Sequence, residues 1–123
     1  MTSIDWEKVF KILSTAAKNG KIEAIAESPL IKEEKVSNYL LIEWLADEGF
    51  IKGISCHGRN VRSENPRLTA LGFDLYCLLQ NTSLWEQFTS TLAEKNLPFT
   101  LTFIKTAIPV FYRDIAENQL NKE

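Results

Sequence analysis

The sequence is short of residues that bind metals or carry redox chemistry. Its 123 residues include two cysteines, Cys56 and Cys77, and a single histidine, His57. These three cannot complete a structural zinc site, which takes four Cys or His ligands. The cysteines form no CxxC pair, and we interpret both as reduced thiols. We therefore expect no metal and no cofactor.

Long apolar runs are also missing. No segment approaches the roughly 18 consecutive apolar residues that a membrane-spanning helix needs. The first five residues lack the charged and apolar regions of a signal peptide. These two absences argue against a membrane protein and predict a cytoplasmic location.

Catalytic patterns are equally scarce. His57 has no nearby serine or cysteine nucleophile with a carboxylate in a recognisable arrangement, and we interpret its place beside Cys56 as coincidence. Gly53 and Gly58 do not precede a helix in the way that phosphate-binding glycines do. The sequence predicts that the protein is not an enzyme.

The apolar content is sufficient for one hydrophobic core. Hydrophobic residues make up 45% of the chain and charged residues 24%, which is typical of a single globular domain at this length. We expect this domain to span residues 1–117, with a core at 4–80 and a helical extension at 83–117. Residues 118–123 are predicted to be a frayed tail.

The spacing of apolar residues predicts three helices in the first half of the chain. The first is capped by Ser3 or Asp5 and ended by Asn19-Gly20. A short second helix is expected at 21–27, because the residue before a proline, here Ser28, avoids the helical region. The third is predicted at 33–48, with acids at its positive end and Gly49 at its far end.

A hairpin is expected after the third helix. Its first strand begins at Phe50-Ile51, and a return strand is expected at Leu68. Turn residues cluster at 57–60 and 63–66 between them.

Three further helices are predicted after the hairpin. Thr69 can cap the first, and Ser83 with Glu86 fits a capping box at the start of the second. Thr100 can cap the last, which Pro109 is expected to kink or split near Ile108.

The net charge of −2 hides an uneven distribution. The stretch 52–67 carries four basic residues against one acid, a local charge of +3. The stretch 33–48 carries five acids against one lysine, a local charge of −4. The predicted hairpin is therefore basic, and the predicted helix before it is acidic.

A helix stopped by glycine and followed by a polar hairpin is the order of a winged helix. The sequence thus predicts a mainly α protein with a small β-hairpin, as a winged helix-turn-helix with additional C-terminal helices. Nucleic acid is the usual partner of such a domain.

Two stretches resemble a known family. Residues 41–51 resemble its "HLxLLxEAGLI" run, and residues 68–75 with Trp85-Glu86 resemble its "LTWxGHxFL…WxxV" run. The family consists of uncharacterised winged-helix proteins common in prophages and mobile elements. The resemblance implies the fold and a phage-linked origin. Leu41 and Phe73 stand where the family has histidines, so no role of those histidines is carried over.

Candidate contacts to DNA follow from the predicted fold. Basic side chains neutralise phosphates, and polar side chains on a helix read base edges. The candidates lie on the hairpin and near the start of the third helix: Lys35, Ser37, Asn38, Lys52, Arg59, Arg62 and Arg67.

The third helix also predicts an apolar face. Leu45, Ile42, Leu41 and Asn38 fall on its core side, whereas Val36, Tyr39, Leu40, Glu43 and Asp47 fall on the opposite side, with Trp44 between them. Either the C-terminal helices cover Tyr39, Leu40 and Trp44, or these residues form an interface with a second copy or a foreign protein.

Two functions are consistent with these features. The first is double-stranded DNA binding by a regulator from a phage or mobile element, with the hairpin on phosphates. The alternative is a non-enzymatic protein-interaction module, such as a phage accessory factor that binds a host protein. The basic hairpin favours the first function, and the acids of the third helix favour the second.

Overall fold

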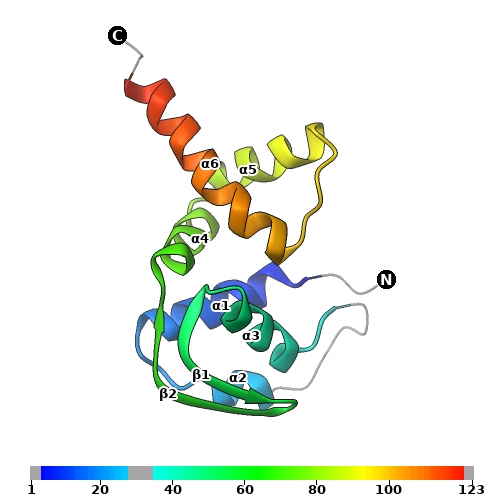
Figure 1. Ribbon diagram of the computed structural model, residues 1–123, viewed down its shortest axis with the longest axis vertical. Helices are drawn as coiled ribbons and strands as arrows, with labels where there is room; N and C mark the ends of the chain where they lie inside the picture. Colours follow the sequence, from blue (N-terminus) through cyan, green and yellow to red (C-terminus); the bar gives the residue numbers. More distant parts are fainter. Residues whose placement is uncertain (1–3, 28–34, 121–123) are drawn as a thin grey trace.

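The computed structural model describes residues 4–27 and 35–120, which form six helices and one antiparallel hairpin (Figure 1). The elements are α1 (Trp6–Ala17), α2 (Glu23–Glu27), α3 (Asn38–Asp47), β1 (Ile51–His57), β2 (Asn60–Leu68), α4 (Ala70–Gln80), α5 (Thr82–Glu94) and α6 (Leu101–Leu120). The prediction of a mainly helical protein with a small hairpin is confirmed. None of the helices described is long and apolar enough to cross a membrane.

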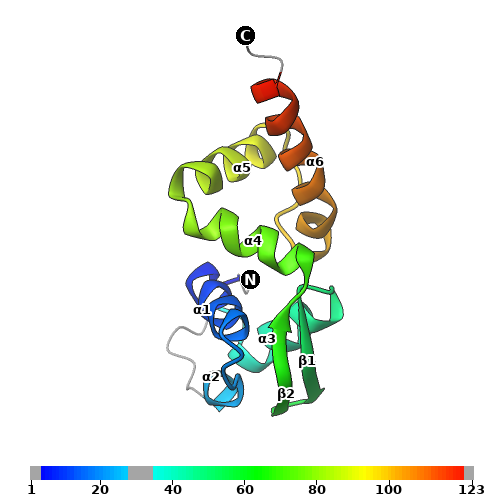
Figure 2. The ribbon, with the colours of Figure 1, turned by 90° about the vertical axis from the view of Figure 1, so that its left-hand side faces the viewer.

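One hydrophobic core joins the two ends of the molecule. Helices α1, α2 and α3 and the hairpin occupy one end, α6 projects at the other, and α4 lies between them (Figure 2). Buried side chains from both ends form one cluster, which runs from Val9 and Ile42 to Phe88 and Ile108. The helical extension is therefore packed on the rest of the domain through a shared core.

The ends of α1 follow local chemistry. The Asp5 carboxylate accepts hydrogen bonds from the backbone N–H groups of Glu7 and Lys8, so Asp5 is the N-cap. At the other end the left-handed residue is Asn19, with φ of 57°, and not Gly20. Asn19 also donates from Nδ2 to the Asn65 side chain and the Pro66 carbonyl of β2, which ties the end of α1 to the hairpin.

Helix α3 starts later than the sequence predicts. It begins at Asn38, so the predicted start at Glu33 is wrong by five residues. Lys35, Val36 and Ser37 precede the helix, and its first turn contains no acid. Glu33 and Glu34 lie outside the described residues.

The two strands of the hairpin are longer than predicted. Residues 58 and 59 form a two-residue turn, as expected, but 63–66 lie within β2 and are not a second turn. These residues form a β-bulge instead. The strand register shifts between Lys52 and Ile54, and Asn65 opposite has a left-handed φ of 57°. Ser63 in turn donates a hydrogen bond to the Glu23 carboxylate, which holds β2 against α2.

A close backbone approach joins the hairpin to α4. Thr69 caps α4 as predicted, since its Oγ1 accepts from the Gly72 N–H. The Thr69 N–H donates to the Phe50 carbonyl at 3.1 Å, and its Oγ1 reaches the Gly49 carbonyl. Gly72 packs directly on the Phe50 carbonyl. The start of α4 is thereby fixed on the segment that follows α3.

The last two helices correct three predictions. Asn81, and not Ser83, caps α5, with its side chain accepting from the Leu84 N–H. Thr100 accepts from the Phe103 N–H, as predicted. Helix α6 continues through Pro109 and is not split there. Residues 118–120 belong to α6, so a frayed tail from 118 is wrong for those three.

Candidate nucleic-acid interface

The hairpin has two chemically different faces. Residues paired across an antiparallel hairpin place their side chains on the same face. The pairs Ile51–Leu68, Ile54–Ser63 and Cys56–Val61 are buried or half-buried and face the helices. The alternate pairs are Lys52–Arg67, Ser55–Arg62 and His57–Asn60, and all six residues are exposed.

The outward face is basic. It brings together Lys52, Arg62 and Arg67, three of the cations expected from the sequence. Glu64, exposed in the unpaired stretch between Arg62 and Arg67, is the one acid among residues 51–68. Arg67 also donates to the Asn65 carbonyl at 3.1 Å, so its guanidinium is anchored at the bulge. An arginine has five N–H donors, and one such bond leaves others for a phosphate.

Arg59 lies in the turn and contacts α3. Its guanidinium carbon is 5.6 Å from the centroid of the Tyr39 ring, a cation–π distance. The turn of the hairpin is thereby held beside the first turn of α3. Arg59 is exposed and lies at the end of the basic face, where it can extend the row of cations.

The start of α3 offers less to DNA than the sequence suggests. Asn38 is 4% exposed, and its Nδ2 donates to the Ile25 carbonyl at 3.0 Å. Ser37 is the N-cap residue, but its hydroxyl is buried and has no hydrogen-bond partner within 4–27 and 35–120. Both side chains point into the protein, so their prediction as DNA contacts is wrong. Lys35 is half-exposed and remains a candidate.

The open side of α3 is apolar and acidic. Tyr39, Leu40 and Glu43 are half-buried, and Trp44 is 38% exposed. The thiol of Cys56, on the inward face of β1, has its pKa raised by burial and then by the negative charges of Glu43 and Asp47. A helix with these side chains would repel phosphates, because no exposed cation of its own offsets the two carboxylates.

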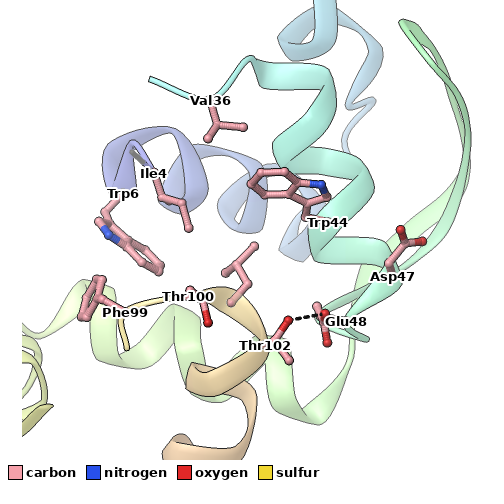
Figure 3. Close-up of a pocket in the computed structure, with 10 residues that line it drawn as sticks. Ile4, Trp6, Val36, Trp44, Asp47, Glu48, Phe99, Thr100 and Thr102 are labelled. Carbon is pink, nitrogen blue, oxygen red and sulfur yellow. Dashed lines mark hydrogen bonds between the residues drawn. The ribbon is translucent and has the colours of Figure 1, made fainter. Parts of the chain in front are cut away.

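A cavity separates α3 from the start of α6. It has a volume of about 670 Å³ and lies between Trp44, the start of α1 and residues 99–102 (Figure 3). Val36 was expected on the exposed side of α3, but it is buried and lines this cavity. The C-terminal helices therefore approach Trp44 without covering it fully.

A polar link that the sequence did not reveal closes one side of the cavity. The Glu48 carboxylate accepts from the Thr102 hydroxyl at 2.7 Å and pairs with Lys105 Nζ at 3.0 Å. The pKa of Glu48 is lowered mainly by the hydrogen bond from Thr102 and to a smaller extent by Lys105. The partners are more than 50 positions apart, and no local pattern in the sequence signals such a pairing.

No family model, curated protein or solved structure matches this chain. The candidate interface on the hairpin is described by its charges and its geometry. It presents three exposed cations on one face of a hairpin, a fourth at its turn, and Lys35 near the start of α3. Such an array can neutralise phosphates, but it supplies few groups that read bases.

Proposed function

We propose that the protein binds double-stranded DNA through the outward face of the β1–β2 hairpin. The observation that carries this proposal is the exposed row of Lys52, Arg62 and Arg67, whose three positive charges outnumber the single acid of the hairpin, Glu64. Cations of this kind bind phosphates and release condensed counterions, a contribution that does not depend on base sequence. Arg59 extends the row at the turn, which lies beside the first turn of α3, and Lys35 precedes that helix.

The acidic side of α3 determines how the duplex can lie. Glu43 and Asp47 disfavour a phosphate beside α3, so the hairpin carries the contact and α3 contributes little to base reading. The hairpin would therefore bind the phosphate backbone of DNA, with modest affinity per protein chain. A regulatory role in a phage or mobile element, and a cytoplasmic location, are parts of the same proposal and rest on the sequence resemblance and composition.

A protein-interaction module is the second candidate. The observation in its favour is the exposed Trp44 beside an apolar cavity, with Leu40 on the same helix. Aromatic side chains next to a cavity are frequent anchors of protein interfaces. In this function the hairpin would serve only as scaffold, and removing its cations would leave binding to the protein partner unchanged.

A charge-removal experiment separates the two functions. Fluorescence anisotropy on a random-sequence duplex at low salt compares the wild type with a triple alanine variant at Lys52, Arg62 and Arg67. We expect the variant to bind about tenfold more weakly or worse, since three phosphate contacts are lost. A matched variant with alanine at Lys8, Lys11 and Arg113, which lie on α1 and α6, removes the same charge and should bind nearly as the wild type.

Two results would reject the DNA proposal. One is a wild type that fails to bind duplex at low salt. The other is equal loss of binding in both triple variants, which would show a response to net charge alone. Circular dichroism of all three proteins checks that each is folded.

A further inference from the structure

The turn cation of the hairpin depends on a contact from another element. Arg59 is the second residue of the turn between β1 and β2, and its guanidinium carbon lies 5.6 Å from the centroid of the Tyr39 ring on α3. Lys52, Arg62 and Arg67 belong to the strands, whose pairing holds their backbone. Arg59 lies outside that pairing, so the contact with Tyr39 is what fixes its side chain.

Tyr39 is itself firmly held. It lies in the first turn of α3, half-buried and packed against the hydrophobic core. The residue before it, Asn38, donates from its side chain to the Ile25 carbonyl of α2 at 3.0 Å. Helix α2 is in turn joined to β2 by the hydrogen bond from Ser63 to Glu23. The ring therefore belongs to a part of the fold that is tied to the hairpin.

The contact leaves the charge of Arg59 available. A tyrosine ring is neutral, so a cation–π contact holds a guanidinium without cancelling its charge. Glu43 follows Tyr39 by four residues and therefore shares its face of the helix. Among the residues that the structure describes, no ion pair joins Arg59 to this carboxylate or to any other. Arg59 is also exposed, so a phosphate can approach it.

Without the ring, Arg59 would lie beside acids. The negative charges of Glu43 and Asp47 act on the inward face of β1, since they help to raise the pKa of the Cys56 thiol. An arginine released from Tyr39 would be free to pair with Glu43, and the pair would offer a phosphate less positive charge. The released side chain would also lose more rotamer freedom when a phosphate immobilised it. Both effects would weaken a phosphate contact at the turn.

We infer that Tyr39 is a positioning residue for duplex binding, whose ring holds Arg59 at the end of the basic face with its positive charge exposed. This role rests on the proposed DNA function and extends it to a residue of α3. It gives Tyr39 a partner within the chain. The sequence had instead grouped Tyr39 with Leu40 and Trp44, as a face for the C-terminal helices or another protein to cover.

A double-mutant cycle tests whether Tyr39 acts through Arg59. Fluorescence anisotropy on a random-sequence duplex at low salt compares the wild type with Tyr39→Leu, Arg59→Ala and the double variant. We expect Tyr39→Leu to bind about two- to tenfold more weakly, because one long side chain must then be ordered on binding. In the Arg59→Ala background the same change should have almost no effect, since the side chain that Tyr39 holds is missing.

Two further variants separate positioning from stability. Tyr39→Phe keeps the ring and should restore wild-type binding. Tyr76→Leu makes the same change at a half-buried tyrosine of α4, away from the hairpin, and should bind as the wild type. In the absence of DNA, the NMR resonances of the Arg59 side chain should shift in Tyr39→Leu but not in Tyr76→Leu, because only the first change removes the ring beside Arg59. Thermal melts check that each variant is folded.

The outcomes distinguish this role from the DNA function on which it rests. A wild type that does not bind duplex would reject the DNA function, and the role of Tyr39 with it. If the wild type binds, equal binding by Tyr39→Leu would reject the role alone. Tighter binding by Tyr39→Leu would also reject it, since Tyr39 would then keep Arg59 away from DNA. The same loss in the Arg59→Ala background would show that Tyr39 does not act through Arg59.

Discussion

At the level of single residues, Gly72 explains the Leu-Thr-x-x-Gly pattern at the start of α4. A Cβ atom at this position would overlap the carbonyl oxygen of Phe50. The same carbonyl accepts from the Thr69 N–H, so it cannot move away without breaking the junction. Glycine is required here by space, since its φ is not in the left-handed region.

We predict that Gly72→Ala lowers the free energy of unfolding by about 3 kcal/mol or more, because backbone must shift to make room. Gly49→Ala is the matched control. Gly49 has φ of 83°, and nothing lies within 4 Å of an added Cβ, so only backbone strain of about 1 kcal/mol is expected. Urea unfolding followed by circular dichroism measures both. A Gly72→Ala variant no less stable than Gly49→Ala would contradict the packing described.

Side-chain direction was the part of the site that the sequence could not predict. Asn38 and Ser37 are polar residues near a helix start, and such residues are equally suited to bind phosphate or the protein backbone. Asn38 is turned inwards by the Ile25 carbonyl of α2, a partner from another element. By contrast, Asp5, Thr69 and Thr100 were predicted correctly, because a capping residue bonds N–H groups two or three positions away.

At the level of elements, Glu48 links the end of α3 to α6. Its carboxylate is held by Thr102 and Lys105, and its pKa is lowered from 4.5 as a result. A carboxyl group with a lower pKa in the folded state stabilises the protein above its unfolded pKa. That contribution is lost as the pH falls through the folded pKa.

The lowered pKa of Glu48 predicts how the stability of a Glu48→Gln variant depends on pH. At neutral pH the variant should melt at a lower temperature than the wild type. The difference in melting temperature between the two proteins should shrink as the pH falls below about 4.5 and the wild-type carboxylate takes up a proton. Glu94→Gln, an exposed change at the end of α5, should show little gap at either pH. A gap for Glu48→Gln that stays constant through this range would show that charge at Glu48 is not involved.

Helix α6 carries its own destabilising residue. Pro109 lacks an N–H group and lies inside a helix that runs from Leu101 to Leu120. Its side chain is exposed, so replacement leaves no cavity. We predict that Pro109→Ala raises the free energy of unfolding by about 1–3 kcal/mol. Glu117→Ala, on the same helix, should change it by only a few tenths. A less stable Pro109→Ala variant in thermal melts would show that the proline has a packing role.

Element type was more predictable than element boundaries. Periodic apolar residues indicated all six helices, because each helix buries one face in the common core. The start of α3 was misplaced because apolar Val36 fits the helical period although it precedes the helix. The turn residues at 63–66 were misread because a bulge and a turn use the same residue types.

At the level of the whole molecule, charge is segregated between the hairpin and α3. The local charges were visible in the sequence, but the outward row was not. It depends on the register of β1 and β2 across a bulge, which pairs Lys52 with Arg67.

The salt dependence of duplex binding tests the central claim most directly. Each phosphate contact contributes about 0.9 to the slope of log K against log salt, so three to five cations predict a slope between about −2.7 and −4.5 per chain. The Lys52, Arg62 and Arg67 triple alanine variant should lose about 2.7 of this slope, and the Lys8, Lys11 and Arg113 variant should lose little. A wild-type slope near zero, or the same slope in wild type and hairpin variant, would contradict binding through the hairpin.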